Sequence, residues 1–148
     1  MPDQPLTPDR RTLARFSDKE FVGNPRAQFV ELGITSCFSF LRGASDAVDL
    51  ALQARALGYD AIGIADANTM AGVVRLHTES KTLKLKPLIG CRIETVEGLC
   101  FLAYPRDRAA YGRLCRLISA GRMRTLDGEW QEKGACDISL AMLATHGE

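Results

Sequence analysis

The sequence has little of what membrane, zinc or disulfide proteins need. No apolar run approaches the roughly 20 residues that a membrane-spanning helix requires, and no charged-then-apolar signal peptide opens the chain. Only two histidines occur, His77 and His146. The cysteines are odd in number, widely spaced and without a CxxC pair, which disfavours a zinc site or a disulfide framework; they are Cys37, Cys91, Cys100, Cys115 and Cys136. We expect buried thiols and a cytoplasmic location.

Neither sign of charge is in clear excess. Nineteen lysines and arginines face 18 acids, so the net charge is only +1. This balance excludes steering of the whole molecule toward nucleic acid or membrane, and any such binding must come from a local patch. With 148 residues, 46% hydrophobic and 25% charged, the composition is typical of one globular domain with a core of its own.

The first 27 residues differ from the rest of the chain. Four of the six prolines lie there, among many charges. We expect a loosely ordered N-terminal arm over residues 1–27 and a folded domain over residues 28–148.

Beyond the arm, strand and helix patterns alternate. Strands are expected at 29–34, 60–66, 87–95 and 98–105, the last two joined by a turn at 96–98. Helices are expected at 46–57, 70–82, 107–121 and 138–146, with a polar loop over 122–134. Ser45 is the expected cap of the first helix, and Gly58 is expected just past its end.

Two helices have a predicted inner face. The face of the second helix is expected to consist of Met70, Val73, Val74 and His77, and that of the third of Tyr111, Leu114, Cys115 and Ile118. The alternation, with strands as apolar as AIGIA, favours an α/β fold with a parallel sheet covered by helices. In that class the chemistry lies at the carboxyl ends of the strands.

Those strand ends offer little for catalysis. A hydrolytic metal site needs three or more convergent His, Asp, Glu or Cys ligands, and only Asp66 and Cys91 are candidates. Ser36 and Ser39 lack a base, and no glycine-rich phosphate loop occurs. Asp66 is more typical of a structural carboxylate that caps the following turn or pairs with an arginine. His77 is more typical of a packing or half-exposed helix residue than of a ligand or base.

One stretch is strongly basic. Six arginines face the single acid Asp107 between residues 106 and 124; they are Arg106, Arg108, Arg113, Arg116, Arg122 and Arg124. A solvated helix face is the ordinary interpretation, and contact with nucleic acid or an acidic partner is the alternative. We expect no aromatic side chain to serve these arginines as a stacking platform, so contact would be with phosphate or protein.

Four blocks of the sequence carry a resemblance. They are ELGITSCFSFLRGAS, LALQARALGYDAIGIADANTMAGVVRLH, KPLIGCRIE and GLCFLAYPRDRAAYGRLCRLISAGR. In this order and spacing they resemble the PHP domain of bacterial C-family DNA polymerases, above all the error-prone, DNA polymerase III alpha-subunit-like members. The resemblance implies a (β/α) barrel of seven strands and roughly 250 residues, a usual size for such barrels. We expect about its first half here, with open sheet edges that favour a homodimer if the short chain is native.

The resemblance also implies where metal ligands would stand. An active PHP domain would carry HxH at the positions of Gly33 and Thr35, and an acid at Arg42. It would carry a histidine at Ala67 and a glutamate at Arg92; among these degenerate positions, Asp66 alone keeps the family's residue. We therefore expect no catalytic residue, no metal and no cofactor. We further hypothesise that Arg42 and Arg92 pair with Asp66 in place of the metal.

The resulting expectation is a metal-free PHP domain that serves as a scaffold for an error-prone polymerase in DNA replication and translesion repair. Its partners would be the polymerase core, mutasome proteins or DNA. Two alternatives stay open. One is an active metal-dependent phosphoesterase or 3′-5′ exonuclease, and the other is a stand-alone module that binds nucleic acid or protein.

Overall fold

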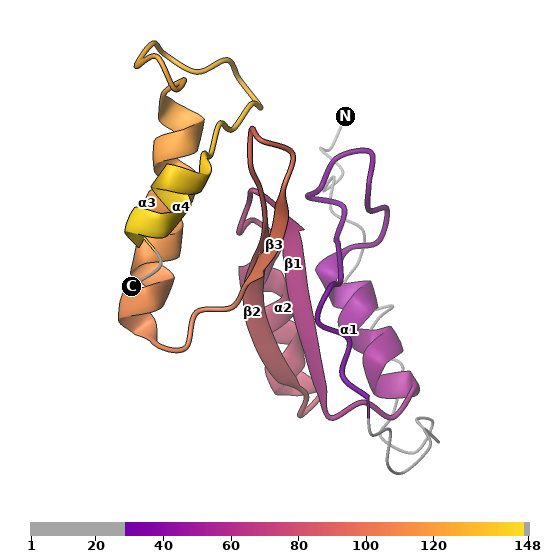
Figure 1. The fold of residues 1–148 in the computed structure, drawn as a ribbon. Coiled ribbons are helices and arrows are strands. Elements are labelled where there is room, and N and C mark those ends of the chain that lie inside the picture. The colour runs from indigo at the N-terminus through magenta and orange to yellow at the C-terminus, as the bar shows by residue number, and fades with distance from the viewer. Residues whose placement is uncertain (1–28, 147–148) are drawn as a thin grey trace, which may run out of the picture.

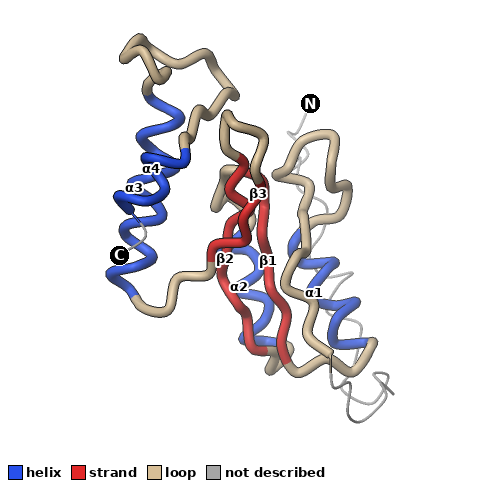
Figure 2. Tube along the Cα trace, in the orientation of Figure 1, coloured by secondary structure: helices blue, strands red, loops and turns tan. Residues whose placement is uncertain are grey.

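A three-stranded mixed sheet with helices on one face forms the fold (Figures 1 and 2). The computed structural model describes residues 29–146, so the expected arm at 1–27 lies outside the described residues. The strands are β1 (Ala61–Ala67), β2 (Lys86–Glu94) and β3 (Cys100–Ala103), in that order across the sheet. The helices are α1 (Ala47–Ala56), α2 (Val73–Thr82), α3 (Arg108–Met123) and α4 (Leu140–His146).

Both kinds of strand pairing occur. β1 and β2 run parallel, with Ile64 opposite Ile89, and the α2 crossover between them makes the βαβ unit that the alternation predicts. β3 returns antiparallel to β2. Gly98, with φ of 82°, provides the left-handed residue in the turn between them. The predicted turn at 96–98 is confirmed.

The expected strand at 29–34 is only partly formed. This segment runs parallel to β1 through a single bridge, Ile34 opposite Ile64. The Gly63 and Ala65 amides donate to the Glu31 and Ile34 carbonyls at 2.8 and 2.7 Å. Between these bonds the Gly33 amide donates to the Glu31 carboxylate at 2.7 Å. The prediction of a full strand is therefore wrong, because a side chain takes one amide.

Helix α1 ends where expected but begins with another cap. Gly58 follows the C-cap with φ of 79°, as predicted. The N-cap is Asp46 and not Ser45: its carboxylate accepts from the Val48 amide at 3.0 Å. A carboxylate also interacts favourably with the positive end of the helix dipole, and Ser45 instead offers its carbonyl to the Cys37 amide.

The predicted inner face of α2 is only partly confirmed, because Val73 is buried and Met70 packs against the core. The helix starts at Val73 rather than Met70, and it buries Val73, Leu76 and Ser80. Val74 is 72% exposed, and His77 also faces solvent. At the N-cap, a Cβ on Gly72 would come within 2.8 Å of the Asp66 carboxylate. The chain therefore lies close to the sheet there, and Val73 and Leu76 pack into the core from this side of the helix.

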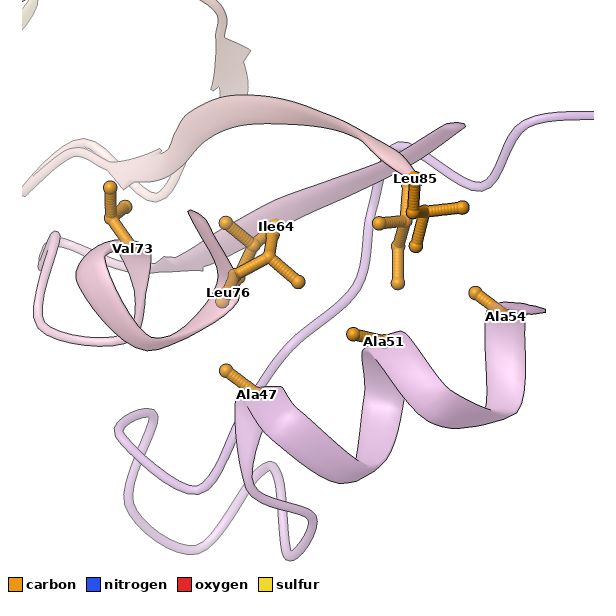
Figure 3. Close-up of a cluster of buried hydrophobic side chains, with 8 residues drawn as sticks. Ala47, Ala51, Ala54, Ile64, Val73, Leu76 and Leu85 are labelled. Atoms are coloured by element: carbon orange, nitrogen blue, oxygen red, sulfur yellow. The ribbon is translucent and has the colours of Figure 1, made fainter. Parts of the chain in front are cut away.

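Two hydrophobic clusters make the core. In the first, α1 presents a face of three alanines, Ala47, Ala51 and Ala54, toward the strands and α2 (Figure 3). Their i, i+4, i+7 spacing gives a narrow flat stripe. Small side chains let α1 approach closely, so Ile64, Leu76 and Leu85 fill the space between α1, α2 and the sheet.

The second cluster lies under α3. The helix begins at the N-cap Asp107, whose carboxylate accepts from the Ala110 amide at 2.8 Å. Its buried residues are Leu114, Leu117, Ile118 and Gly121. The prediction holds for Leu114 and Ile118, whereas Tyr111 is exposed and Cys115 half-buried. Ile138 is fully buried in this cluster ahead of α4, so that helix starts two residues later than predicted.

The helices share one face of the sheet. Side chains alternate along a strand, and the register pairs Ile64 with Ile89 and Asp66 with Cys91, so Ile64 and Cys91 point to the same side. The α1 and α2 cluster contains Ile64, and the α3 cluster contains Cys91. Helices on one side of a partly parallel sheet are consistent with part of a barrel wall. No helix within residues 29–146 is long and apolar enough to cross a membrane.

Two glycines of α3 test how this helix packs against residues 136–138. A Cβ on Gly121 would lie 2.8 Å from the Asp137 carbonyl oxygen, whereas one on Gly112 would meet only the Arg116 side chain at 3.5 Å. We expect Gly112→Ala to raise the free energy of unfolding by about 0.5–1 kcal/mol, because alanine favours helix. Gly121→Ala should lower it by about 1 kcal/mol, since the clash exceeds the same gain. Urea denaturation measures both, and equal effects would contradict the packing.

Candidate functional site

The candidate residues gather at the carboxyl edge of the sheet, around Asp66. Asp66 is 2% exposed, and its carboxylate accepts three hydrogen bonds of 2.7 Å. The donors are the Ser36 amide, the Ser36 hydroxyl and the Ser39 hydroxyl. The Ser39 Oγ in turn accepts from the Ala67 amide at 2.9 Å. Both carboxylate oxygens are thus engaged, and they fix the 36–45 loop to the end of β1.

The hypothesised ion pair between the arginines and Asp66 is wrong. Arg42 pairs with Glu94 of β2 instead, and an Arg92 terminal nitrogen donates to the Gly33 carbonyl at 3.1 Å. The Asp66 carboxylate is buried and accepts its hydrogen bonds from the two serines. The Arg42 guanidinium stays about half exposed to solvent and bonds to Glu94. In place of the following turn or an arginine, the partners of Asp66 are Ser36 and Ser39, to which the sequence assigned only a lack of catalytic base.

Asn68 lies at the same edge of the sheet, and the sequence analysis gave it no role. It follows β1 in the left-handed region with φ of 47°, a conformation that asparagine tolerates well. Its side-chain amide donates to the Glu94 carbonyl at 3.1 Å and accepts from the Glu94 amide at 2.9 Å. Its own carbonyl accepts from Arg122 Nε at 3.0 Å. Asn68 therefore joins the ends of β1, β2 and α3.

The residues at this edge do not fit a metal centre. Gly33 and Ala67 have no donor side chain, and Arg42 and Arg92 are cations. Burial raises the pKa of the Cys91 thiol to about 12, so it is protonated at neutral pH, and it donates to the Asp66 carbonyl at 3.3 Å. A thiolate is the form that ligates metals. Among residues 29–146, no three His, Cys, Asp or Glu side chains converge as a ligand set.

Tyr104 covers the sheet face opposite the helices. A Cβ on either Gly63 or Gly90 would lie 2.6 Å from Tyr104 atoms, so the ring lies directly on the two glycines. Its hydroxyl donates to the Leu32 carbonyl. Burial raises the pKa of Tyr104 to about 12, which keeps this donor protonated at neutral pH. This contact ties the chain after β3 to the segment before β1.

The six arginines of the basic stretch differ in exposure and in their partners. Arg113 is half-buried, and the other five, Arg106, Arg108, Arg116, Arg122 and Arg124, are exposed. Arg122 is tied to Asn68. The Arg124 guanidinium lies over the Trp130 ring, with its carbon 3.9 Å from the ring centroid. The expectation that no aromatic serves these arginines is therefore wrong, because the 124–130 turn folds Trp130 back onto Arg124.

An apolar pocket adjoins this turn. Its volume is about 460 Å³, and it lies between the end of α3 and the start of α4. Its lining residues are Ala120, Met123, Arg124, Thr125, Leu126, Ser139 and Met142.

Comparison with known proteins supplies the family. The family model described as PHP domain matches residues 31–148. The chain is 51% identical over 121 residues to an error-prone DNA polymerase of Rhodopseudomonas palustris, a match that covers 78% of this chain. It is 46% identical over 121 residues to an error-prone DNA polymerase of Caulobacter vibrioides, covering 81% of this chain. These matches span 10% and 11% of the respective polymerases, so the chain corresponds to about a tenth of their length.

A solved structure is also similar. A Bifidobacterium adolescentis protein named as a metal-dependent phosphoesterase superposes with a TM-score of 0.48 at 27% identity. The match covers 83% of this chain and 52% of that one. Since the family model spans most of the described domain, the expectation drawn from the four sequence blocks is confirmed: the chain belongs to the PHP domain family, and its similar relatives are error-prone DNA polymerases.

Proposed function

We propose that this PHP domain is a non-catalytic scaffold of an error-prone DNA polymerase that acts in DNA replication and repair in the cytoplasm. The similarity to error-prone polymerases supports the parent function. The scaffold role is supported by one observation above all: both oxygens of the Asp66 carboxylate accept hydrogen bonds from Ser36 and Ser39. A carboxylate with both oxygens engaged by protein donors has little capacity left for a metal.

The arginines support the same proposal. Arg42 and Arg92 stand where the family resemblance places metal ligands, and each instead links two parts of the edge. Arg42 joins the 36–45 loop to β2 through Glu94, and Arg92 joins β2 to the segment before β1 through the Gly33 carbonyl. Two guanidinium groups beside the site would also repel a divalent cation. The polymerase core and mutasome proteins are the proposed partners.

The absence of catalysis is testable directly. We expect no hydrolysis of bis-p-nitrophenyl phosphate above the blank when Mn²⁺ or Zn²⁺ is added to the chain, because two-metal hydrolysis needs a ligand set. Isothermal titration with each metal should likewise give no saturable heat. A heat-denatured sample of the same preparation is the control for contaminants. A metal-dependent rate present only in the native sample would favour the phosphoesterase alternative.

The parent function has its own test. An antibody raised against residues 29–146 should detect a polypeptide on the order of ten times longer than this chain in extracts of the source cells. This expectation follows from the tenth of each relative that the chain spans. A single band at 16.2 kDa, the mass of the chain, would favour a stand-alone module.

A further inference from the structure

Trp130 has surroundings that are unusual for a tryptophan. It is the only tryptophan of the chain, and 69% of it is exposed. Tryptophan more often buries most of its surface in cores or at interfaces. Here the Arg124 guanidinium lies 3.9 Å from the ring centroid, well within the 6 Å or so of a cation–π contact. The arginine backs the ring, and the exposed remainder faces solvent.

The loop that carries Trp130, residues 124–131, is held by backbone hydrogen bonds. Arg124 and Trp130 pair as an antiparallel bridge, and the Thr125 amide donates to the Glu129 carbonyl at 2.9 Å. Gly128 allows the turn with φ of 86°. The Gln131 amide donates to the Met123 carbonyl at 3.1 Å, which anchors the turn to the end of α3. A ring held in this way loses little freedom when a ligand stacks on it.

The charges nearby are mixed. Arg122 donates from Nε to Asn68, and Arg124 donates to the Gly128 carbonyl at 3.2 Å. A guanidinium has five N–H donors, so both arginines keep donors for phosphate. The same loop holds the acids Asp127, Glu129 and Glu132. Charge alone therefore does not attract a polyanion here, and stacking must supply most of the binding free energy.

The position of the loop also matters. The Arg122 to Asn68 bond holds the end of α3 at the carboxyl edge of β1. In Figure 1 the orange loop that follows α3 rises beyond the end of the helix, on the side toward which β1 points. The loop that carries Trp130 thus begins two residues after Arg122, which contacts the edge where α/β proteins bind their ligands.

We propose that Trp130 and Arg124 form a stacking platform for a base of a single-stranded nucleic acid. The base stacks on the exposed part of the indole, Arg124 backs the ring, and the remaining donors of Arg122 and Arg124 contact the flanking phosphates. Single strands fit this chemistry because their bases offer free π-faces and an aromatic ring accepts any base. In a duplex those faces are occupied by neighbouring bases.

This inference goes beyond the scaffold role, and the two fail separately. A chain that hydrolyses phosphodiesters would overturn the scaffold proposal and leave the platform standing. A chain without affinity for single strands would overturn the platform and leave the scaffold standing.

The direct test uses the single tryptophan as its own reporter. Titration of the 148-residue chain with a ten-nucleotide oligo(dT) should quench Trp130 fluorescence to saturation. Contacts from two arginines predict that log K falls with log salt with a slope of about −1.4, since each phosphate contact on a single strand contributes roughly −0.7. The matching dT·dA duplex should quench far less. Equal binding of duplex and single strand, or no quenching, would overturn the proposal.

Variants assign the binding to the platform. Fluorescence anisotropy of labelled oligo(dT) should show Trp130→Ala binding at least about 5-fold more weakly, the lower end of what one stacked base contributes. Arg124→Lys keeps the charge but loses the planar group, so it should also weaken binding. Phe40→Ala removes another exposed aromatic, 84% exposed, and should bind like the unmodified chain. Thermal melts confirm that each variant folds. Unchanged affinity of Trp130→Ala would contradict the platform.

Discussion

Replacement of Asp66 by alanine should destabilise the domain more than any other single change considered. The carboxylate is 2% exposed and accepts three hydrogen bonds. Its removal therefore leaves the buried Ser36 amide without an acceptor and creates a cavity. We expect the free energy of unfolding to fall by about 3 kcal/mol, because an unsatisfied buried donor alone costs about 1–3 kcal/mol. The midpoint of thermal unfolding, followed by circular dichroism, should fall by roughly 10 °C.

Two further variants make this result interpretable. Asp66→Asn keeps the shape and one acceptor oxygen, so its loss should be smaller than that of alanine. Asp127→Ala removes an exposed loop carboxylate and should change stability by less than about 0.5 kcal/mol. A loss for Asp66→Ala no larger than for Asp127→Ala would mean that the serine network does not hold the 36–45 loop to β1.

Gly43→Ala should have the second largest effect. A Cβ at this position would lie 2.3 Å from the Ser36 carbonyl oxygen and 2.7 Å from that of Thr35. Both are backbone atoms, so no side chain can move aside and the loop itself must open. We expect a loss of about 1–3 kcal/mol in urea denaturation, the usual range for overpacking.

The loop should also report the change locally. The Cys37 amide donates to the Ser45 carbonyl at 2.9 Å across the neck of the loop, so its hydrogen exchange should accelerate in Gly43→Ala. Gly112→Ala is the matched control, since its added methyl group meets no backbone. If Gly43→Ala were no less stable than the unmodified chain, the close approach at Gly43 would be refuted.

Much of the fold follows from local sequence patterns. The apolar run AIGIA forms a buried strand, and Gly58 ends α1, because burial and left-handed geometry are properties of a few adjacent residues. The phase of α2 does not follow in this way. It depends on packing against other elements, since Val73 and Leu76 share a hydrophobic cluster with Ile64 of β1. The Val74 and His77 spacing is equally helical, so periodicity alone does not show that these two residues face solvent.

The surroundings of Asp66 also could not be predicted from local sequence patterns alone. The position of Asp66 after an apolar strand identifies it as a strand-end residue, but its partners come from a loop about 30 residues earlier in the chain. The serines lack any local signal of burial. Trp130 likewise reaches Arg124 across a turn in which Gly128 takes a φ of 86°. A glycine between an arginine and an aromatic is the signal that could have indicated the contact.

The three-way junction at Asn68 has a dynamic consequence. One residue bonds both to Glu94 of β2 and to Arg122 of α3, so Asn68 couples the end of α3 to the edge of the sheet. The ends of β1, β2 and α3 should therefore open as one cooperative unit, or foldon, with a shared exchange free energy. Strain applied at the end of α3 would reach the strand ends through the same bonds.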